Sequence, residues 1–280
     1  MSNPYLENSP HFGKSKNRHA PVPYADGRGG QATIPQGYEP QFESVQQSYY
    51  GPDAGPQDTG RMTYEDVIVR TAGLLALVVG SAAAAWFLVP MEMKFVAMWG
   101  GLIIGFVLGL VNVFKKEPSP PLIMAYGVAQ GFFLGTLSGF FEMMYPDIVV
   151  QAVGATFVTF GVTLALFRSG KVRVTPKFRK IVMIALVSYA VFALINLGVM
   201  IFTDFGGAFG LRSGGWGLAI GALAVVLAAA VLVMDFDQIT KGVQNGTPRR
   251  FAWSAAFGLV LTLIWLYVEF LRILAILRGD

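Results

Sequence analysis

The stretch WGLAIGALAVVLAAAVLVM, residues 216–234, decides the fold class of this chain. It contains no charged residue, and it is as long as the run of about 20 apolar residues that a helix needs to cross a bilayer. Because backbone polar groups in lipid must pair within their own segment, such a run is predicted to be helical. Six further runs of comparable length accompany it, at Val67–Val89, Phe95–Phe114, Pro121–Tyr145, Ile148–Phe167, Ile181–Thr203 and Phe251–Leu277. Since the connections are short, we predict one all-α membrane domain, a bundle of seven transmembrane helices.

The composition of the whole chain agrees with a membrane domain and excludes several kinds of chemistry. Of the 280 residues, 54% are hydrophobic and only 14% are charged, whereas soluble domains carry roughly 25% charged residues. Cysteine is absent, and the two histidines, His11 and His19, lie outside the apolar runs. Disulfide frameworks, thiolate metal sites and intramembrane histidine catalysis are therefore excluded. We expect neither an enzyme nor a bound cofactor.

Residues 1–61 differ in composition from residues 62–280. The first 60 residues contain eight of the 15 prolines, and they show no apolar periodicity. Such a segment cannot bury enough apolar surface to offset its ordering entropy, so we predict a disordered tail. At the start of the membrane domain, Thr63 and Asp66 have the spacing of a helix N-terminal capping box.

The distribution of basic residues predicts the orientation of the bundle. Lys94 and Arg212 are the basic residues of the three connections that would face outward if the N-terminus is cytoplasmic. Cytoplasmic connections of membrane proteins are enriched in Lys and Arg. We therefore predict a protein of the cytoplasmic membrane whose N-terminus lies on the cytoplasmic side and whose C-terminus lies on the outer side. The net charge of +4 then reflects topology and contact with anionic lipid rather than nucleic-acid binding. Eleven basic residues would face the cytoplasm, namely Lys115, Lys116, Arg168, Lys171, Arg173, Lys177, Arg179, Lys180, Lys241, Arg249 and Arg250.

Glycines recur every four residues in the second and third apolar runs. Glycines with this spacing form a flat stripe that lets two helix backbones approach closely. We expect ordinary close packing, with the two stripes facing each other; a conduit or sliding interface is the functional alternative. The stripes consist of Gly101, Gly105 and Gly109, and of Gly127, Gly131, Gly135 and Gly139.

Carboxyl groups within the membrane runs are the main candidates for function, because ionisable groups in lipid are costly. Asp235 and Asp237 end the sixth run, and Glu269 lies in the seventh. A buried carboxyl prefers its neutral form, and carboxylates are also favoured calcium ligands. A carboxyl pair or a carboxyl–lysine pair would therefore make a proton-sensitive cation gate. The structural alternatives are an interfacial helix end for the two aspartates and an ion pair of Glu269 with Arg272.

Several segments together resemble the Bax inhibitor-1 family, in particular its bacterial YccA-like branch with an extended N-terminus. The resemblance rests on Asp235–Ile239 at the end of the sixth run, Leu266–Phe270 in the seventh, Ala129–Gly135 in the third and Ile195–Asn196 in the fifth. It covers residues 62–280. For the fold, it implies seven helices with a central last helix.

For function, the resemblance implies a pH-sensitive calcium leak. In characterised relatives, two aspartates on the last two helices share a proton, and a basic residue at the end of the second helix holds the closed form. Asp235 matches the first aspartate; the second position falls on Glu269 or on Thr262, depending on how the last helix is matched. Lys115 and Lys116 are the nearest equivalents of the basic residue.

The depths of these residues leave the partner of Asp235 open. At 1.5 Å per residue, straight helices would hold Glu269 far from Asp235, whereas Thr262 is nearer but cannot ionise. Asp237, Lys115 or Lys116 could serve instead.

Two classes of function are open, and the partner of Asp235 distinguishes them. The first is a proton-modulated cation leak, with calcium as the partner ion and Asp235 as its direct contact. The second is a non-conducting interaction protein that binds and modulates a membrane protease or a stress-response complex. A gate requires a second carboxyl opposite Asp235, and a binding protein does not.

Overall fold

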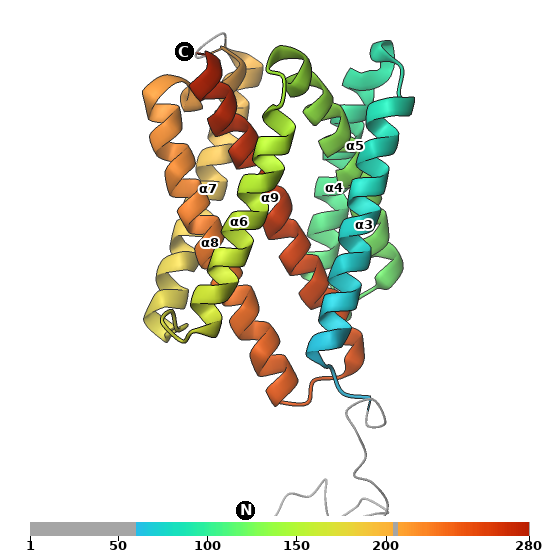
Figure 1. Cartoon of the computed structure of the whole chain (residues 1–280), viewed down its shortest axis with the longest axis vertical. Coiled ribbons are helices and arrows are strands. Elements are labelled where there is room, and N and C mark those ends of the chain that lie inside the picture. The colour runs from blue at the N-terminus through green and yellow to red at the C-terminus, as the bar shows by residue number, and fades with distance from the viewer. Residues whose placement is uncertain (1–59, 204–206, 280) are drawn as a thin grey trace, which may run out of the picture. The chain divides into compact units, whose positions relative to one another are not determined.

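The computed structural model describes residues 60–203 and 207–279, so most of the predicted tail lies outside the described residues. Within the described part, seven helices are long and apolar enough to cross a membrane (Figure 1). This confirms the predicted all-α seven-helix membrane fold. The helices are α3 (Tyr64–Leu88), α4 (Met91–Phe114), α5 (Pro120–Met144), α6 (Ile148–Arg168), α7 (Pro176–Phe202), α8 (Gly214–Gln244) and α9 (Ala252–Gly279), with the short 3-10 segments η1 (Gly207–Arg212) and η2 (Arg249–Phe251).

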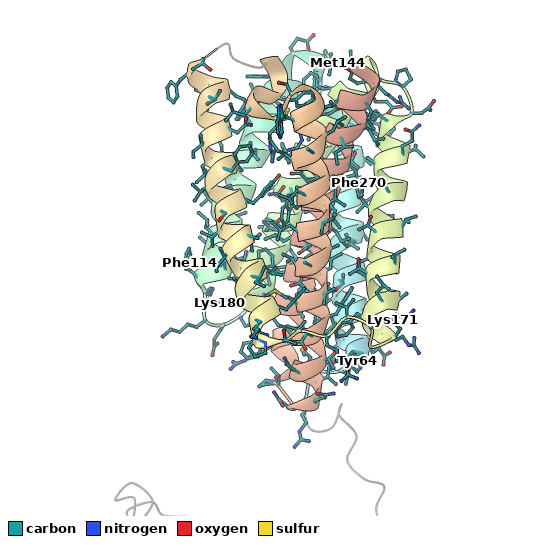
Figure 2. All side chains as sticks on the ribbon, turned by 90° about the vertical axis from the view of Figure 1, so that its left-hand side faces the viewer. Tyr64, Phe114, Met144, Lys171, Lys180 and Phe270 are labelled. Carbon is teal, nitrogen blue, oxygen red and sulfur yellow. The ribbon has the colours of Figure 1, made fainter. Side chains whose placement is uncertain are left out.

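Successive helices alternate in direction, so the bundle has two ends. We call them the proximal end, where α3 begins, and the distal end, where α9 ends; they are the lower and upper ends in Figure 1. Figure 2 shows Lys171 and Lys180 at the proximal end with Tyr64, and Met144 at the distal end. The lysine-bearing connection between α6 and α7 therefore lies at the same end of the bundle as the start of α3.

The last helix is central. α9 packs against α3, α5, α6 and α8, and its Val260, Leu266 and Leu271 are fully buried. By contrast, α4 packs chiefly on α5, and α7 packs on α8 and η1, so these two helices lie at the periphery. Large apolar side chains cover the outside of the bundle, for example Phe114 and Phe202, which suits contact with lipid.

The start of α3 is tied to the connection between α8 and α9. The capping box is present: Asp66 N donates to Thr63 Oγ1 at 3.1 Å, and Thr63 N donates to Asp66 Oδ2 at 3.3 Å. Asp66 also accepts from Arg249 Nε at 2.7 Å. Nearby, Met62 N donates to the carbonyl oxygen of Thr247 at 2.7 Å. These contacts hold the entry to the bundle against the beginning of α9.

The sixth helix is longer than its apolar run predicts. The run ends at Met234, but α8 continues to Gln244. Phe236 and Ile239 are buried in the same cluster as Leu259 and Leu266 of α9, so packing continues the helix beyond the charge-free stretch. Asp235 and Asp237 therefore lie inside a helix, and the interpretation that they mark a helix end is wrong.

The glycine stripe of α4 lies against α5. A methyl group at Gly101 would lie 2.8 Å from the carbonyl oxygen of Ala129, and one at Gly105 would lie 2.6 Å from Nε2 of Gln130. Further along, a methyl group at Gly109 would contact the ring of Tyr126. These glycines let α4 sit close to one face of α5.

The glycine stripe of α5 faces α3 instead. Methyl groups at Gly131 and Gly135 would overlap Ser81 and the carbonyl oxygen of Ala82, and one at Gly127 would lie 2.8 Å from Leu74. The expectation that the two stripes face each other is therefore wrong. α5 lies between α3 and α4, and its glycines lie on one face of the helix. Only one neighbour can pack against that face, and α3 does so. Gly139, near the distal end, lies beside Lys94.

Candidate functional site

Asp235 on α8 faces α9 and contacts Thr262. The hydroxyl of Thr262 lies 3.0 Å from Asp235 Oδ2, and Thr262 is only 1% exposed. The same hydroxyl lies 3.1 Å from the carbonyl oxygen of Gly258, one turn earlier in α9. Gly258 also leaves room for the carboxyl, since a methyl group there would lie 3.7 Å from Asp235 Oδ1. Of the two positions proposed for the second gate residue, the structure brings Thr262 to Asp235.

This geometry satisfies either protonation state of Asp235. A threonine hydroxyl has one proton to donate, so it can serve the carboxylate or the Gly258 carbonyl, but not both fully. When Asp235 is ionised, Thr262 donates to it. When Asp235 is protonated, it can donate to the Thr262 oxygen while the hydroxyl donates to Gly258. Asp235 can therefore gain or lose a proton without leaving a buried donor or acceptor unpaired.

The other proposed partners of Asp235 are engaged elsewhere or lie far from it. Asp237 pairs with Lys241 Nζ at 2.6 Å and with Arg179 Nη2 at 3.5 Å. Two residues along a helix is a rotation of about 200°, so Asp237 points away from Asp235. The predicted pairings of Asp235 with Asp237 or a lysine are thus absent from the described residues.

Lys115 and Lys116 lie in the connection from α4 to α5. Their neighbour Glu117 pairs with Arg250 of η2 at 3.2 Å, so this connection lies near the start of α9. Neither lysine forms an ion pair with a carboxyl among residues 60–203 and 207–279, so the structure does not place either of them as a latch.

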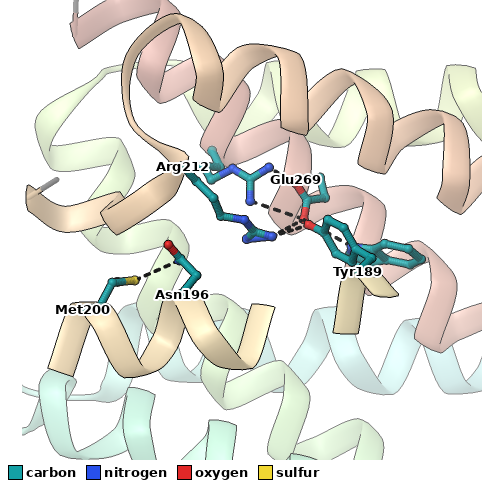
Figure 3. Close-up of polar contacts among 7 residues, drawn as sticks. Tyr189, Asn196, Met200, Arg212 and Glu269 are labelled. Atoms are coloured by element: carbon teal, nitrogen blue, oxygen red, sulfur yellow. Dashed lines mark hydrogen bonds and ion pairs between the residues drawn. The ribbon is translucent and has the colours of Figure 1, made fainter. Parts of the chain in front are cut away.

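Glu269 lies seven residues after Thr262 in α9, in a separate buried cluster (Figure 3). Its Oε1 accepts from Trp265 Nε1 at 3.2 Å, from Arg212 Nη2 at 3.3 Å and from the hydroxyl of Tyr189. Arg272 donates to both carboxylate oxygens, which is the ion pair considered as the structural alternative above. With this many donors, the carboxylate of Glu269 is neutralised and satisfied. It is not the partner of Asp235.

Arg212 reaches this cluster because Asn196 on α7 holds the segment η1. Leu211 N donates to Asn196 Oδ1 at 2.7 Å, and Asn196 Nδ2 donates to Met200 Sδ at 3.4 Å (Figure 3). Gly210 has a φ of 59°, and a methyl group there would lie 2.7 Å from Asn196 Oδ1. The turn therefore requires glycine at this position, and it directs the next basic residue into the bundle.

Sequence reasoning missed Tyr189, Arg212 and Trp265 as parts of this cluster. Arg212 enters that reasoning only as one of two basic residues in the outward connections. Trp265 stands four residues before Glu269, and this helical spacing is a usable signal. Tyr189 has no such signal, because only the packing of α7 against α8 brings it near.

Among the described residues, no group of three or more His, Cys, Asp or Glu side chains is arranged to hold a metal ion. Calcium in a stable protein site takes six to eight oxygen ligands. Asp235 and Thr262 supply only a small part of such a set.

Comparison with known proteins identifies a family. The family model described as Bax inhibitor 1 like matches residues 3–279. A search of curated proteins finds no matching relative. The family match does not separate its branches, and the bacterial YccA-like assignment stays a prediction.

Proposed function

The chain belongs to the Bax inhibitor 1 like family, and from this premise we propose that it is a proton-sensitive cation leak in which Asp235 is the titrating group. Calcium is the proposed ion, the cytoplasmic membrane the proposed location, and the predicted orientation places the proximal end inside. The proposal is of a conducting protein without a cofactor, not of an enzyme.

One observation carries the proposal: Asp235 is a carboxyl in the membrane bundle without a basic partner among the described residues. Asp66, Asp237 and Glu269 each lie within 4.0 Å of an arginine or lysine nitrogen. Asp235 has the neutral hydroxyl of Thr262 instead. A proton or cation that binds Asp235 therefore changes the net charge between α8 and α9 with no neighbouring cation to offset it.

A leak requires a site that holds the ion weakly. Conduction depends on binding that is favourable enough for entry and weak enough for exit. One carboxylate and one hydroxyl meet this requirement better than a complete calcium cage. Protonation of Asp235 removes the charge that attracts the cation, so the proposal predicts less flux at low pH.

Calcium flux into vesicles tests the proposal. The purified chain is reconstituted into liposomes loaded with a calcium-sensitive dye, and flux is compared at pH 6 and pH 8. The wild type is expected to conduct more at pH 8, and Asp235→Asn is expected to give equal flux at both values. Asp237→Asn is the matched control, because it makes the same change two residues away on a paired carboxyl, and it should keep the pH response. A pH response that survives in Asp235→Asn contradicts the proposal.

An open apolar groove favours the second function. A cavity of about 410 Å³ lies between α3, α5, α6 and α9, with Trp86, Phe157 and Tyr267 among its lining residues. Such a surface suits a helix of another membrane protein, as expected of a non-conducting protein that binds a membrane protease or stress-response complex. No calcium flux at either pH, together with a cross-link from Phe157 to a membrane protease, would favour this function over the leak.

A further inference from the structure

The cluster around Glu269 has more positive than negative charge. Arg212 and Arg272 both form ion pairs with this single carboxylate. Glu269 is 2% exposed and Arg272 is 6% exposed, so the cluster lies inside the bundle. Among residues 60–203 and 207–279, Glu269 is the one carboxylate that pairs with these two guanidinium groups, so one positive charge is left without a partner; Arg212, at 15% side-chain exposure, is largely buried. Buried charge without compensation is strongly unfavourable, so the cluster favours a further anion.

The two arginines also have donors to offer to that anion. Nε of Arg212 and Nε of Arg272 are both inaccessible to solvent, and neither has a hydrogen-bond partner among the described residues. Buried polar groups in native proteins are nearly always hydrogen-bonded. Guanidinium groups recognise phosphate and carboxylate in particular, because their N–H groups form a planar fork.

An apolar groove leads to this cluster between α7 and α8. It is a cavity of about 540 Å³, and its lining includes Ile181, Ala185, Leu223 and Val226. Apart from Ser188 and Tyr189, the lining side chains are apolar. Along α7 the lining runs from residue 181 to residue 192, about 16 Å, which is close to half the thickness of a bilayer core.

Two aromatic side chains of the groove lining connect it to the arginines. Tyr189 and Phe192 line the groove, and the guanidinium of Arg212 lies over both rings, 5.2 Å and 6.0 Å from their centroids. Tyr189 also donates to Glu269 and accepts from Arg212. Arg272 is seven residues from the end of α9 at Gly279, about 10 Å, so the cluster lies toward the distal end.

We propose that Arg212 and Arg272 bind the anionic headgroup of a membrane phospholipid whose acyl chain lies in the groove between α7 and α8. The phosphate balances the excess charge and accepts from the unpaired Nε donors. The acyl chain covers the apolar lining. This site is separate from Asp235 and does not depend on the proposed cation leak.

Native mass spectrometry of the reconstituted chain tests the proposal. The full chain is placed in nanodiscs of phosphatidylglycerol and phosphatidylcholine in equal amounts. The lipids that stay bound to the protein after its release from the nanodisc are counted. The wild type is expected to retain phosphatidylglycerol preferentially. Arg212→Gln should weaken that retention by about tenfold or more, because a charge-assisted contact is lost. Arg278→Gln is the matched control, since Arg278 is exposed at the same end and its loss should leave retention unchanged.

Glu269→Gln separates a binding role from a purely structural one. This change removes the carboxylate that competes for the two arginines, so retention of phosphatidylglycerol should rise; if the cluster only holds helices together, retention should not rise. Val226→Trp is a second test in case Glu269→Gln does not fold. It fills the groove without changing charge and should lower retention, whereas Val150→Trp on the exposed surface of α6 should not.

Three outcomes overturn the proposal. The first is equal retention of the two lipids by the wild type. The second is an Arg212→Gln variant that behaves like Arg278→Gln. The third is displacement of phosphatidylglycerol by millimolar inorganic phosphate, because the site would then take a free anion and not a lipid.

Discussion

The hydroxyl of Thr262 on α9 lies 3.0 Å from the carboxylate of Asp235 on α8, and this contact joins the two helices within the bundle. The family resemblance implies a second aspartate on the last helix, whereas the residue of α9 that meets Asp235 in this chain is a threonine. With threonine there, a single carboxyl carries all of the charge that can change at this position. In the proposed leak, proton and cation binding would therefore be properties of Asp235 alone, with one neutral hydroxyl as its partner.

Loss of the Thr262 hydroxyl should destabilise the protein. Thr262→Val keeps the shape of the side chain but leaves Asp235 without its buried donor, and hydrogen bonds to charged groups contribute about 1.5–3 kcal/mol. We expect a lower midpoint in thermal unfolding followed by circular dichroism. Thr156→Val is the control, because Thr156 is also buried, at 6% exposure, but donates only to the carbonyl of Ala152 in its own helix. Equal effects of the two substitutions would show that the contact with Asp235 contributes nothing.

Two carboxyl-to-amide substitutions should have very different effects. Glu269→Gln leaves the buried guanidinium of Arg272 and the partly buried one of Arg212 without their counter-ion, a change that costs about 3–5 kcal/mol. Asp235→Asn removes a carboxylate that has no basic partner, and the amide oxygen can still accept from Thr262, so its effect should be within about 1 kcal/mol. Unfolding in mixed micelles measures both. The reverse order of stability would contradict the assignment of Glu269 as the structural carboxyl.

The glycines of α5 should tolerate no side chain where α3 approaches. A methyl group at Gly135 would overlap the carbonyl oxygen of Ala82, so Gly135→Ala should destabilise the bundle by about 1–3 kcal/mol. Gly154→Ala is the control: Gly154 lies in α6 with no atom within 4 Å of the added methyl, and the change should be neutral or stabilising by up to about 1 kcal/mol. Thermal unfolding of both variants decides the point.

The absence of cysteine allows a direct test of orientation. Single cysteines at Lys171 and Arg278, both exposed and at opposite ends of the bundle, can be labelled with a membrane-impermeant maleimide on a background without other thiols. If the N-terminus is cytoplasmic, Arg278→Cys should react in intact cells, and Lys171→Cys should react only after the membrane is opened. The opposite pattern would invert the predicted topology.

Several features of this protein are determined by the sequence alone. The apolar run at residues 216–234 and its six companions predict membrane helices, because the requirement for internal backbone pairing in lipid depends only on length and hydrophobicity. The capping box of Thr63 and Asp66 is also local, since its partners lie three residues apart. The absence of cysteine and of membrane histidine excludes whole classes of chemistry without any structure.

Tertiary structure decided which of these residues meet. The choice between Thr262 and Glu269 depends on the depth and rotation of α9 against α8, and the described helix packing brings Thr262 to Asp235. The face of the α5 glycines depends on whether α3 or α4 occupies it, and the spacing is the same in either case. The cluster of Glu269 unites Tyr189, Arg212 and Arg272 from two helices and a connecting segment. Sequence periodicity describes the faces of one helix, whereas contacts between helices depend on how those faces pack together.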